Sequence, residues 1–206
     1  MPTGLADIVA DRLKAAVTRL YPMLISNPDY TAIISTRHRE RLNAMVKEAR
    51  DGGARIIEIN PAAERFDERT RKFPPMLVIG AAANTRLMRE EVFGPLLPIV
   101  EYDGLDHAIA MVNQGDRPLA LYWFGRSVAN RDRVLRETIS GGVTVNDCLW
   151  HLAQEEQPFG GVGPSGTGAY HGEWGFRTLS KEKPVFYQAR LNGSRFFIPL
   201  TARLSS

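Results

Sequence analysis

Three short stretches of the chain combine residue types that could do chemistry. The first, Glu90 to Pro95, joins two adjacent carboxylates to a phenylalanine, a glycine and a proline. The apolar spacing before it predicts a short helix over Thr85 to Val92, which would place both carboxylates at the helix C-terminus. The helix dipole disfavours negative charge there. These carboxylates therefore either face solvent or accept hydrogen bonds from the hydroxyls of a ligand.

The second stretch surrounds the single cysteine. Cys148 directly follows Asp147 and lies three residues before His151, so a base could lie near a thiol nucleophile. The sequence offers no donor that could stabilise an oxyanion, and a free cysteine is more often a small buried hydrophobic residue. We therefore interpret Cys148 as structural and predict no catalytic residue here.

The third stretch, Gly161 to Gly166, matches the G-x-G-x-x-G pattern of dinucleotide-binding loops. That pattern requires a preceding strand and a following helix, whereas residues 154–158 are polar and end in a proline. We interpret the glycines as a tight, irregular loop, and we expect its backbone to lie very close to a neighbouring group that the sequence does not identify. A free-standing nucleotide binder stays as a further, weaker hypothesis, and a strand over Gln154 to Phe159 would support it.

Composition excludes several classes of protein. The 206 residues are 44% hydrophobic, as in a globular protein with a real core. One cysteine rules out a disulfide framework and suits the reducing cytosol, so we expect a cytoplasmic protein. No apolar run approaches the roughly 20 residues of a membrane span, and no residues have the spacing of a metal site. The net charge of +3 is dispersed among acidic residues, which argues against nucleic-acid binding.

Apolar periodicity predicts the elements that position these stretches. Helices are expected from Leu5 to Leu20 and around Leu42 to Ala49, with Ser127 as the N-cap of a later helix. The alternation of strands and helices predicts an α/β fold, a mostly parallel sheet flanked by helices and followed by an irregular C-terminal tail. The strands of that sheet are expected at Ala54–Ile59, Leu97–Tyr102, Leu119–Phe124 and Val143–Asn146, with a further short strand at Met76–Ile79.

Taken together and in order, the motifs resemble the aldehyde dehydrogenase superfamily. The segments that carry the resemblance are Met88–Pro95, Pro118–Tyr122, Gly141–Asp147 and Pro158–Gly166. Arg37-His38 and Gly166-Thr-Gly-Ala-Tyr-His-Gly172 resemble the class 3 branch, and most of all its coniferyl-aldehyde dehydrogenases. The similarity extends from about Leu13 to Arg190, which is most of the chain.

The resemblance implies a role for four residues. In the family, the second glutamate of the acidic motif binds the nicotinamide ribose of NAD or NADP, and here it is Glu91. The phenylalanine of the motif, here Phe93, packs beside the nicotinamide ring, and the class 3 Arg-His pair suggests His38 as a further cofactor contact. The P-F-G-G loop borders the substrate through Phe159. We therefore expect Glu91, Phe93 and Phe159 at one edge of the sheet.

The resemblance also implies parts that this sequence does not contain. The family's nucleophilic cysteine, its general-base glutamate and its Rossmann cofactor domain all precede the matching segment, and Cys148 is not at the nucleophile's position. We expect residues 1–190 to form a portion of the catalytic domain and residues 191–206 to form a tail that contacts an oligomer partner. The chain alone should bind NAD or NADP weakly or not at all and should be inactive.

Two functional hypotheses follow. The first is part of an oxidoreductase that converts an aryl or fatty aldehyde to the carboxylate. The second is a non-enzymatic α/β module that associates with a full-length relative. Either way we expect a homodimer or such an association, an exposed apolar patch where a cofactor domain would pack, and a partner for the apolar residues 196–200.

Overall fold

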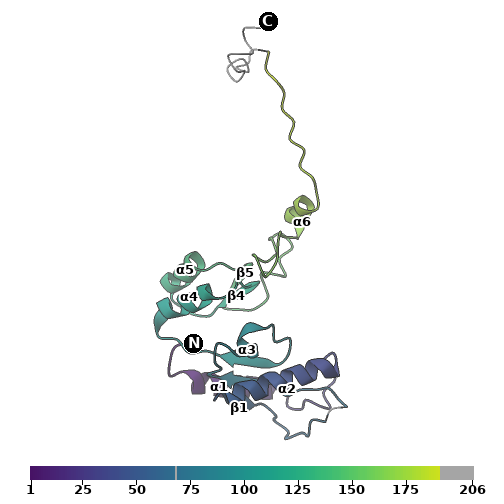
Figure 1. Ribbon diagram of the computed structural model, residues 1–206, viewed down its shortest axis with the longest axis vertical. Coiled ribbons are helices and arrows are strands. Elements are labelled where there is room, and N and C mark those ends of the chain that lie inside the picture. The colour runs from purple at the N-terminus through teal and green to yellow at the C-terminus, as the bar shows by residue number, and fades with distance from the viewer. Residues whose placement is uncertain (68, 191–206) are drawn as a thin grey trace. The chain divides into compact units, whose positions relative to one another are not determined.

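The computed structural model describes residues 1–67 and 69–190, and the chain divides into two compact units. The first unit is Met1–Gly115 and the second begins at Asp116. Figure 1 shows helices and strands in both units. The tail residues 196–200, for which we predict a partner, lie outside the described residues. Within the described part of the chain, no helix is both long and apolar enough to cross a membrane.

The first unit is a three-stranded sheet with helices on both faces. Its strands are β1 (Arg55–Glu58), β2 (Met76–Ile79) and β3 (Leu96–Ile99), in the order β1-β2-β3. β2 runs parallel to β3 and antiparallel to β1. The helices of this unit are α1 (Ala6–Leu20), α2 (Thr36–Asp51), α3 (Arg86–Arg89) and α4 (Gly104–Gln114).

The central strand β2 is buried along its whole length, and its side chains alternate between two apolar clusters. On one face, Met76 and Val78 pack in a cluster with the buried residues of α2, which are Leu42, Met45, Val46 and Ala49. On the other face, Leu77 and Ile79 pack with Ala6 and Ala10 of α1. The sheet therefore fixes α2 on one of its faces and α1 on the other.

The second unit is built around a two-stranded parallel sheet. β4 (Ala120–Trp123) pairs with β5 (Gly142–Val145), and α5 (Val128–Glu137) connects them. Ser127 caps α5 as predicted, because its hydroxyl accepts the backbone N–H of Asn130 at 3.2 Å. After β5 the chain forms loops up to the short helix α6 (Gly172–Thr178). Residues 181–190 contain no helix or strand and are exposed.

The predicted α/β fold is confirmed. The expected single, mostly parallel sheet of Ala54–Ile59, Leu97–Tyr102, Leu119–Phe124 and Val143–Asn146 is wrong, because these strands belong to two sheets, β1-β2-β3 and β4-β5, each with one parallel pair. The remaining differences have local causes. β1 is antiparallel to β2, because the chain returns directly from one strand to the next through a loop instead of a helix. The predicted helix over Thr85 to Val92 is too long. α3 ends at Arg89, and Glu90 is extended with ψ 153°. Glu90 is therefore the C-cap of α3, at the helix C-terminus, whereas Glu91 lies in the segment after the helix.

Candidate functional site

The acidic motif lies in the segment between α3 and β3, and two adjacent residues of α2 hold it. The guanidinium of Arg41 donates hydrogen bonds to the backbone carbonyl oxygens of Glu91, at 3.0 Å, and Val92. At the other end of the segment, Gly94 lies against Leu42, so closely that a Cβ on Gly94 would be 2.5 Å from Leu42 Cδ1. The segment is therefore fastened to the helix at both ends.

The two carboxylates of the motif have different surroundings. Glu90 pairs with Arg86 at 3.0 Å and with Arg41 at 3.5 Å. The hydrogen bond from Arg86 is the main reason that the pKa of Glu90 lies below its ordinary value. Glu91 is exposed, and among the described residues its carboxylate has no hydrogen-bond partner. Glu90 is therefore engaged within the protein, whereas the carboxylate of Glu91 is available to a ligand.

Phe93 presents its ring to the outside. The side chain is 69% exposed, and the backbone has a φ of 47°, which is uncommon for a residue with a bulky side chain. The ring lines an apolar hollow of about 450 Å³ together with residues of the Tyr30–Ile34 segment, Phe73 and Pro95. An exposed aromatic ring held in an uncommon conformation suits a surface that receives another planar group.

His38 lies in the first turn of α2. Its backbone N–H donates to the Ser35 hydroxyl, which caps the helix. His38 lines an open hollow of about 630 Å³ together with Arg37, Glu40, Arg41, Ala44 and Arg86. The ring nitrogen Nδ1 of His38 is buried and has no hydrogen-bond partner among the described residues. The three arginines of the lining, against a single glutamate, fit a ligand that carries negative charge.

Phe159 belongs to a cluster of five rings in the second unit, which we call the ring cluster. Its members are Tyr122, His151, Phe159, Tyr170 and His171. Phe159 and Tyr170 exchange two backbone hydrogen bonds of 3.0 and 2.9 Å, and their rings meet edge to face at 5.2 Å. The His171 ring stacks on Phe159 at 5.9 Å. Phe159 is thus the ring that most of the other members contact.

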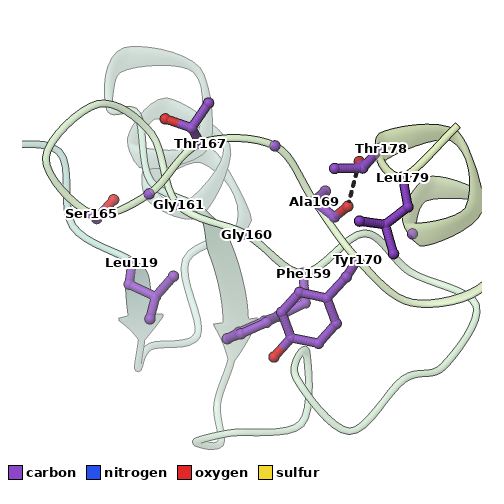
Figure 2. Close-up of a pocket in the computed structure, with 13 residues that line it drawn as sticks. Leu119, Phe159, Gly160, Gly161, Ser165, Thr167, Ala169, Tyr170, Thr178 and Leu179 are labelled. Carbon is purple, nitrogen blue, oxygen red and sulfur yellow. Dashed lines mark hydrogen bonds between the residues drawn. The ribbon is translucent and has the colours of Figure 1, made fainter. Parts of the chain in front are cut away.

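The glycine-rich loop lies next to Phe159, and the close approach predicted for it is real. A Cβ on Gly161 would lie 2.1 Å from the carbonyl oxygen of Ser165, and a Cβ on Gly160 would lie 2.1 Å from that of Gly168. Figure 2 shows this loop folding back beside Phe159 and Tyr170, around a hollow of about 360 Å³. The group that the backbone approaches is therefore the loop's own backbone.

This geometry does not support the hypothesis of a free-standing nucleotide binder. Residues 154–158 form turns and no strand, and Phe159 makes only an isolated bridge to Tyr170. The helix after the loop, α6, begins at Gly172, six residues beyond the last glycine of the motif. The strand–loop–helix arrangement that places a pyrophosphate at a helix N-terminus is missing from these residues.

Cys148 is exposed, so the expectation of a small buried residue was wrong. The turn after β5 places it at the surface, where Asp147 accepts the backbone N–H of Cys148 at 2.8 Å and the indole N–H of Trp150 at 3.0 Å. His151 is engaged elsewhere, because its Nδ1 is hydrogen-bonded to the hydroxyl of Thr144 at 2.8 Å. Among the described residues, no hydrogen bond joins the Cys148 thiol to a base.

Of the residues predicted to form the site, Glu91, Phe93 and His38 lie in the first unit. Arg41 bonds the Glu91 carbonyl and lines the same hollow as His38, whereas Phe93 lines a different hollow. Phe159 lies in the second unit. Their arrangement around one cofactor ring stays a prediction. Sequence reasoning missed Arg41, although its position one helical turn after His38 places both on the same side of α2.

Comparison with known proteins identifies the family. The sequence model of the aldehyde dehydrogenase family matches residues 2–185. The chain belongs to the aldehyde dehydrogenase family. It is 52% identical, over 178 residues, to a probable coniferyl aldehyde dehydrogenase of Caulobacter vibrioides, covering 86% of this chain and 37% of that protein. Aldehyde dehydrogenase family 3 member A2 of Mus musculus is 40% identical over 182 residues, 88% of this chain and 36% of the relative.

Solved structures of aldehyde dehydrogenases share the fold. The substrate-bound state of Staphylococcus aureus AldH superposes with a TM-score of 0.79 at 34% identity, covering 98% of this chain and 43% of that one. A betaine aldehyde dehydrogenase double mutant of the same species, in complex with NAD⁺, superposes with a TM-score of 0.71 at 25% identity, covering 86% and 36%. The present chain therefore spans well under half the length of these aldehyde dehydrogenases.

Proposed function

We propose that this chain contributes the nicotinamide end of the cofactor site, and part of the substrate wall, of an NAD- or NADP-dependent aldehyde dehydrogenase. One observation carries the proposal. Of two adjacent carboxylates, Glu90 is engaged by arginines and Glu91 is free, while Arg41 holds the Glu91 backbone in place. A carboxylate on an anchored backbone, unpaired among the described residues, suits the binding of a diol, because each of its oxygens can accept a hydrogen bond from a hydroxyl.

The residues of the first unit fit the nicotinamide half of such a cofactor. When bound, the cofactor supplies the hydride acceptor. Glu91 accepts hydrogen bonds from the ribose hydroxyls, and the exposed Phe93 ring packs against the planar nicotinamide and excludes water from one of its faces. His38 and Arg41 line one hollow, whose arginines would attract the phosphate oxygens of the cofactor. All these residues bind and orient; none of them transfers a proton.

The substrate wall is assigned to Phe159 in the ring cluster. An aryl aldehyde offers a flat ring that can pack on such a surface, which favours a coniferyl-aldehyde-like substrate over a fatty aldehyde. The name of the Caulobacter relative supports the same choice. The product would be the corresponding carboxylate.

We assign no catalytic residue to this chain, and we expect it to be inactive alone. Aldehyde oxidation in the family requires an activated thiolate, whereas the Cys148 thiol is exposed and has no base bonded to it among the described residues. Removal of the nucleophile lowers kcat by about 10⁶-fold in subtilisin. The purified chain should therefore not oxidise coniferyl aldehyde with NAD⁺ or NADP⁺. Turnover that disappears in Cys148→Ala would contradict this assignment.

The test of the cofactor site uses nicotinamide mononucleotide, which carries only the part of the cofactor assigned to this chain. Its binding to the 206-residue chain is followed by NMR titration. Glu91→Gln should weaken binding about 10-fold, as expected for the loss of a charged hydrogen-bond acceptor. Glu58→Gln, an exposed glutamate of β1 that lines neither the hollow of Phe93 nor that of His38, is the matched control and should bind like the parent. Equal binding by parent and Glu91→Gln would overturn the proposal.

A second candidate function is a module that associates with a full-length relative or with itself. It is favoured by the exposed apolar side chains of α6 and the segment after it, where Phe176, Leu179, Phe186 and Tyr187 are each at least 74% exposed. Burial of such side chains against a partner is favourable, because it removes apolar surface from water. Sedimentation of the chain at increasing concentration tests this. A stable monomer at high concentration, with and without a full-length relative, would count against association.

A further inference from the structure

The ring of His151 has no part in the proposed function, yet it is held in place by two residues of β5. The backbone N–H of His151 donates to the hydroxyl of Thr144 at 3.2 Å, and the same hydroxyl is hydrogen-bonded to ring Nδ1 at 2.8 Å. Thr144 is itself buried, with 8% of its surface exposed. A buried hydroxyl that bonds both the backbone and the ring of one residue restricts that ring to a single orientation.

β5 also makes room for the ring. A Cβ on Gly142 would lie 2.4 Å from His151 Cδ2, so no larger residue fits there unless the ring moves. Gly142 and Thr144 are two residues apart on one strand and therefore face the same side of the sheet. One residue holds the ring by hydrogen bonds, and the other leaves the space that it fills.

The fixed ring lies between two members of the ring cluster. His151 is 6.0 Å from Tyr122 of β4 and 6.1 Å from Phe159, measured between ring centroids, and the planes of His151 and Phe159 differ by 32°. These separations are in the range in which aromatic rings influence one another's orientation. The other ring nitrogen of His151, Nε2, is buried without a partner among the described residues, so the Thr144 hydroxyl orients the ring.

We propose that His151 is a positioning residue, which transmits the rigidity of β5 to Phe159 and so fixes the face that Phe159 presents to an aryl substrate. The substrate part of this statement rests on the proposed function, whereas the positioning of Phe159 does not. The chain of contacts is Thr144 hydroxyl, His151 ring, Phe159 ring. No proton is transferred along it.

The test observes the Phe159 ring itself. In the 206-residue chain with isotope-labelled phenylalanine, the ring signals of Phe159 are assigned by their loss in Phe159→Leu. Thr144→Val keeps the shape of the side chain but removes the hydroxyl, and it should shift and broaden these signals. Thr144→Ser keeps the hydroxyl and should leave them close to those of the parent. Gly142→Ala displaces the His151 ring without removing a hydrogen-bonding group, and it should perturb the same signals.

Titration with coniferyl alcohol, which carries the aryl ring without the reactive carbonyl, tests the substrate part. The Phe159 signals of the parent should respond, and Thr144→Val should need about 2- to 10-fold more ligand, as for the loss of one well-placed aromatic contact. Phe159 signals that stay unchanged in both Thr144→Val and Gly142→Ala would overturn the positioning role. Perturbed signals in these variants, with no response of the parent to the alcohol, would overturn the assigned substrate contact and leave the positioning role standing.

Discussion

The guanidinium of Arg41 donates a hydrogen bond to the backbone carbonyl oxygen of Glu91, with 3.0 Å between Nη1 and the oxygen. The contact joins two segments separated by 50 residues, and it acts on the backbone of Glu91 and leaves its carboxylate free. The same guanidinium also bonds the carbonyl of Val92 and pairs with Glu90. A single side chain of α2, that of Arg41, thereby determines where the surface residue Glu91 lies.

Removal of this anchor should loosen the acidic segment while the helix stays intact. Arg41→Met keeps the aliphatic stem but loses the donors, and hydrogen bonds from a charged group to two carbonyls contribute about 2 kcal/mol. We expect faster hydrogen exchange over residues 90–93 and a loss of stability of that order. Arg37→Met, an exposed arginine of the same helix, is the control. Unchanged exchange over residues 90–93 in Arg41→Met would show that the anchor has no effect.

Gly94→Ala should disturb the same segment from its other end. The new Cβ would lie 2.5 Å from Leu42 Cδ1, and Leu42 is completely buried in the cluster under α2, so it cannot move aside freely. Overpacking of this kind costs about 1–3 kcal/mol. Gly115→Ala is the matched control, because its nearest neighbour would be 3.7 Å away. Urea unfolding monitored by circular dichroism compares the two, and equal midpoints would contradict the expected clash.

Those parts of the fold whose local pattern and tertiary role agree could be predicted from the sequence. Apolar residues at three- and four-residue spacing predicted α1 to its last residue. Only part of that pattern packs on the sheet: Leu13 and Val17 contact the buried cluster, whereas Ile8 and Leu20 are exposed. Met76–Ile79 was predicted with its exact bounds, since a short, fully apolar run is typical of a strand covered on both faces.

The rest depended on contacts that no local pattern carries. The spacing over residues 85–92 favours a helix, but Arg41 and Leu42 draw the second half of that segment into an extended form along α2. Arg41 looks like an ordinary surface arginine in the sequence. The same holds for the ring cluster, whose members come from residues 122 to 171 and meet only after the loops beyond β5 fold back.

The first unit should lose stability in acid through Glu64. Its carboxylate accepts the backbone N–H groups of Leu24, at 2.6 Å, and Ile25, at 3.1 Å. Desolvation acts to raise the pKa of Glu64, but these hydrogen bonds, one from Ser26 and the charge of Lys72 outweigh it, so the pKa lies below the ordinary 4.5. A lowered folded-state pKa means that the contribution is complete above the unfolded value and is lost as the pH falls through the folded one.

Glu64→Gln should therefore destabilise the first unit at pH 7, and the difference from the parent should shrink as the pH is lowered below 4.5. Hydrogen exchange of the α2 amides in urea, measured at a series of pH values, gives the free energy of unfolding of the first unit. Its pH dependence in the parent and in Glu64→Gln measures both effects. Glu40→Gln removes the same charge from an exposed position of α2 and should lack this convergence. A difference between parent and Glu64→Gln that stays constant from pH 7 to pH 3 would show that ionised Glu64 is not the source.

Two alanine substitutions in the glycine-rich loop distinguish a structural role of this loop from a ligand-binding role. Gly161→Ala would place its Cβ 2.1 Å from the carbonyl oxygen of Ser165, a backbone atom that cannot move without breaking the loop, and should cost about 3 kcal/mol. Gly163 has a φ of +62° and open space around its missing side chain, so Gly163→Ala should cost only about 1 kcal/mol of backbone strain. All three tryptophans belong to the second unit, so fluorescence during urea unfolding reports on it directly.

If the loop instead cradled a phosphate group, NAD⁺ would raise the unfolding midpoint of the parent and not that of Gly161→Ala. We expect no such stabilisation, and its appearance would restore the nucleotide-binding interpretation of this loop.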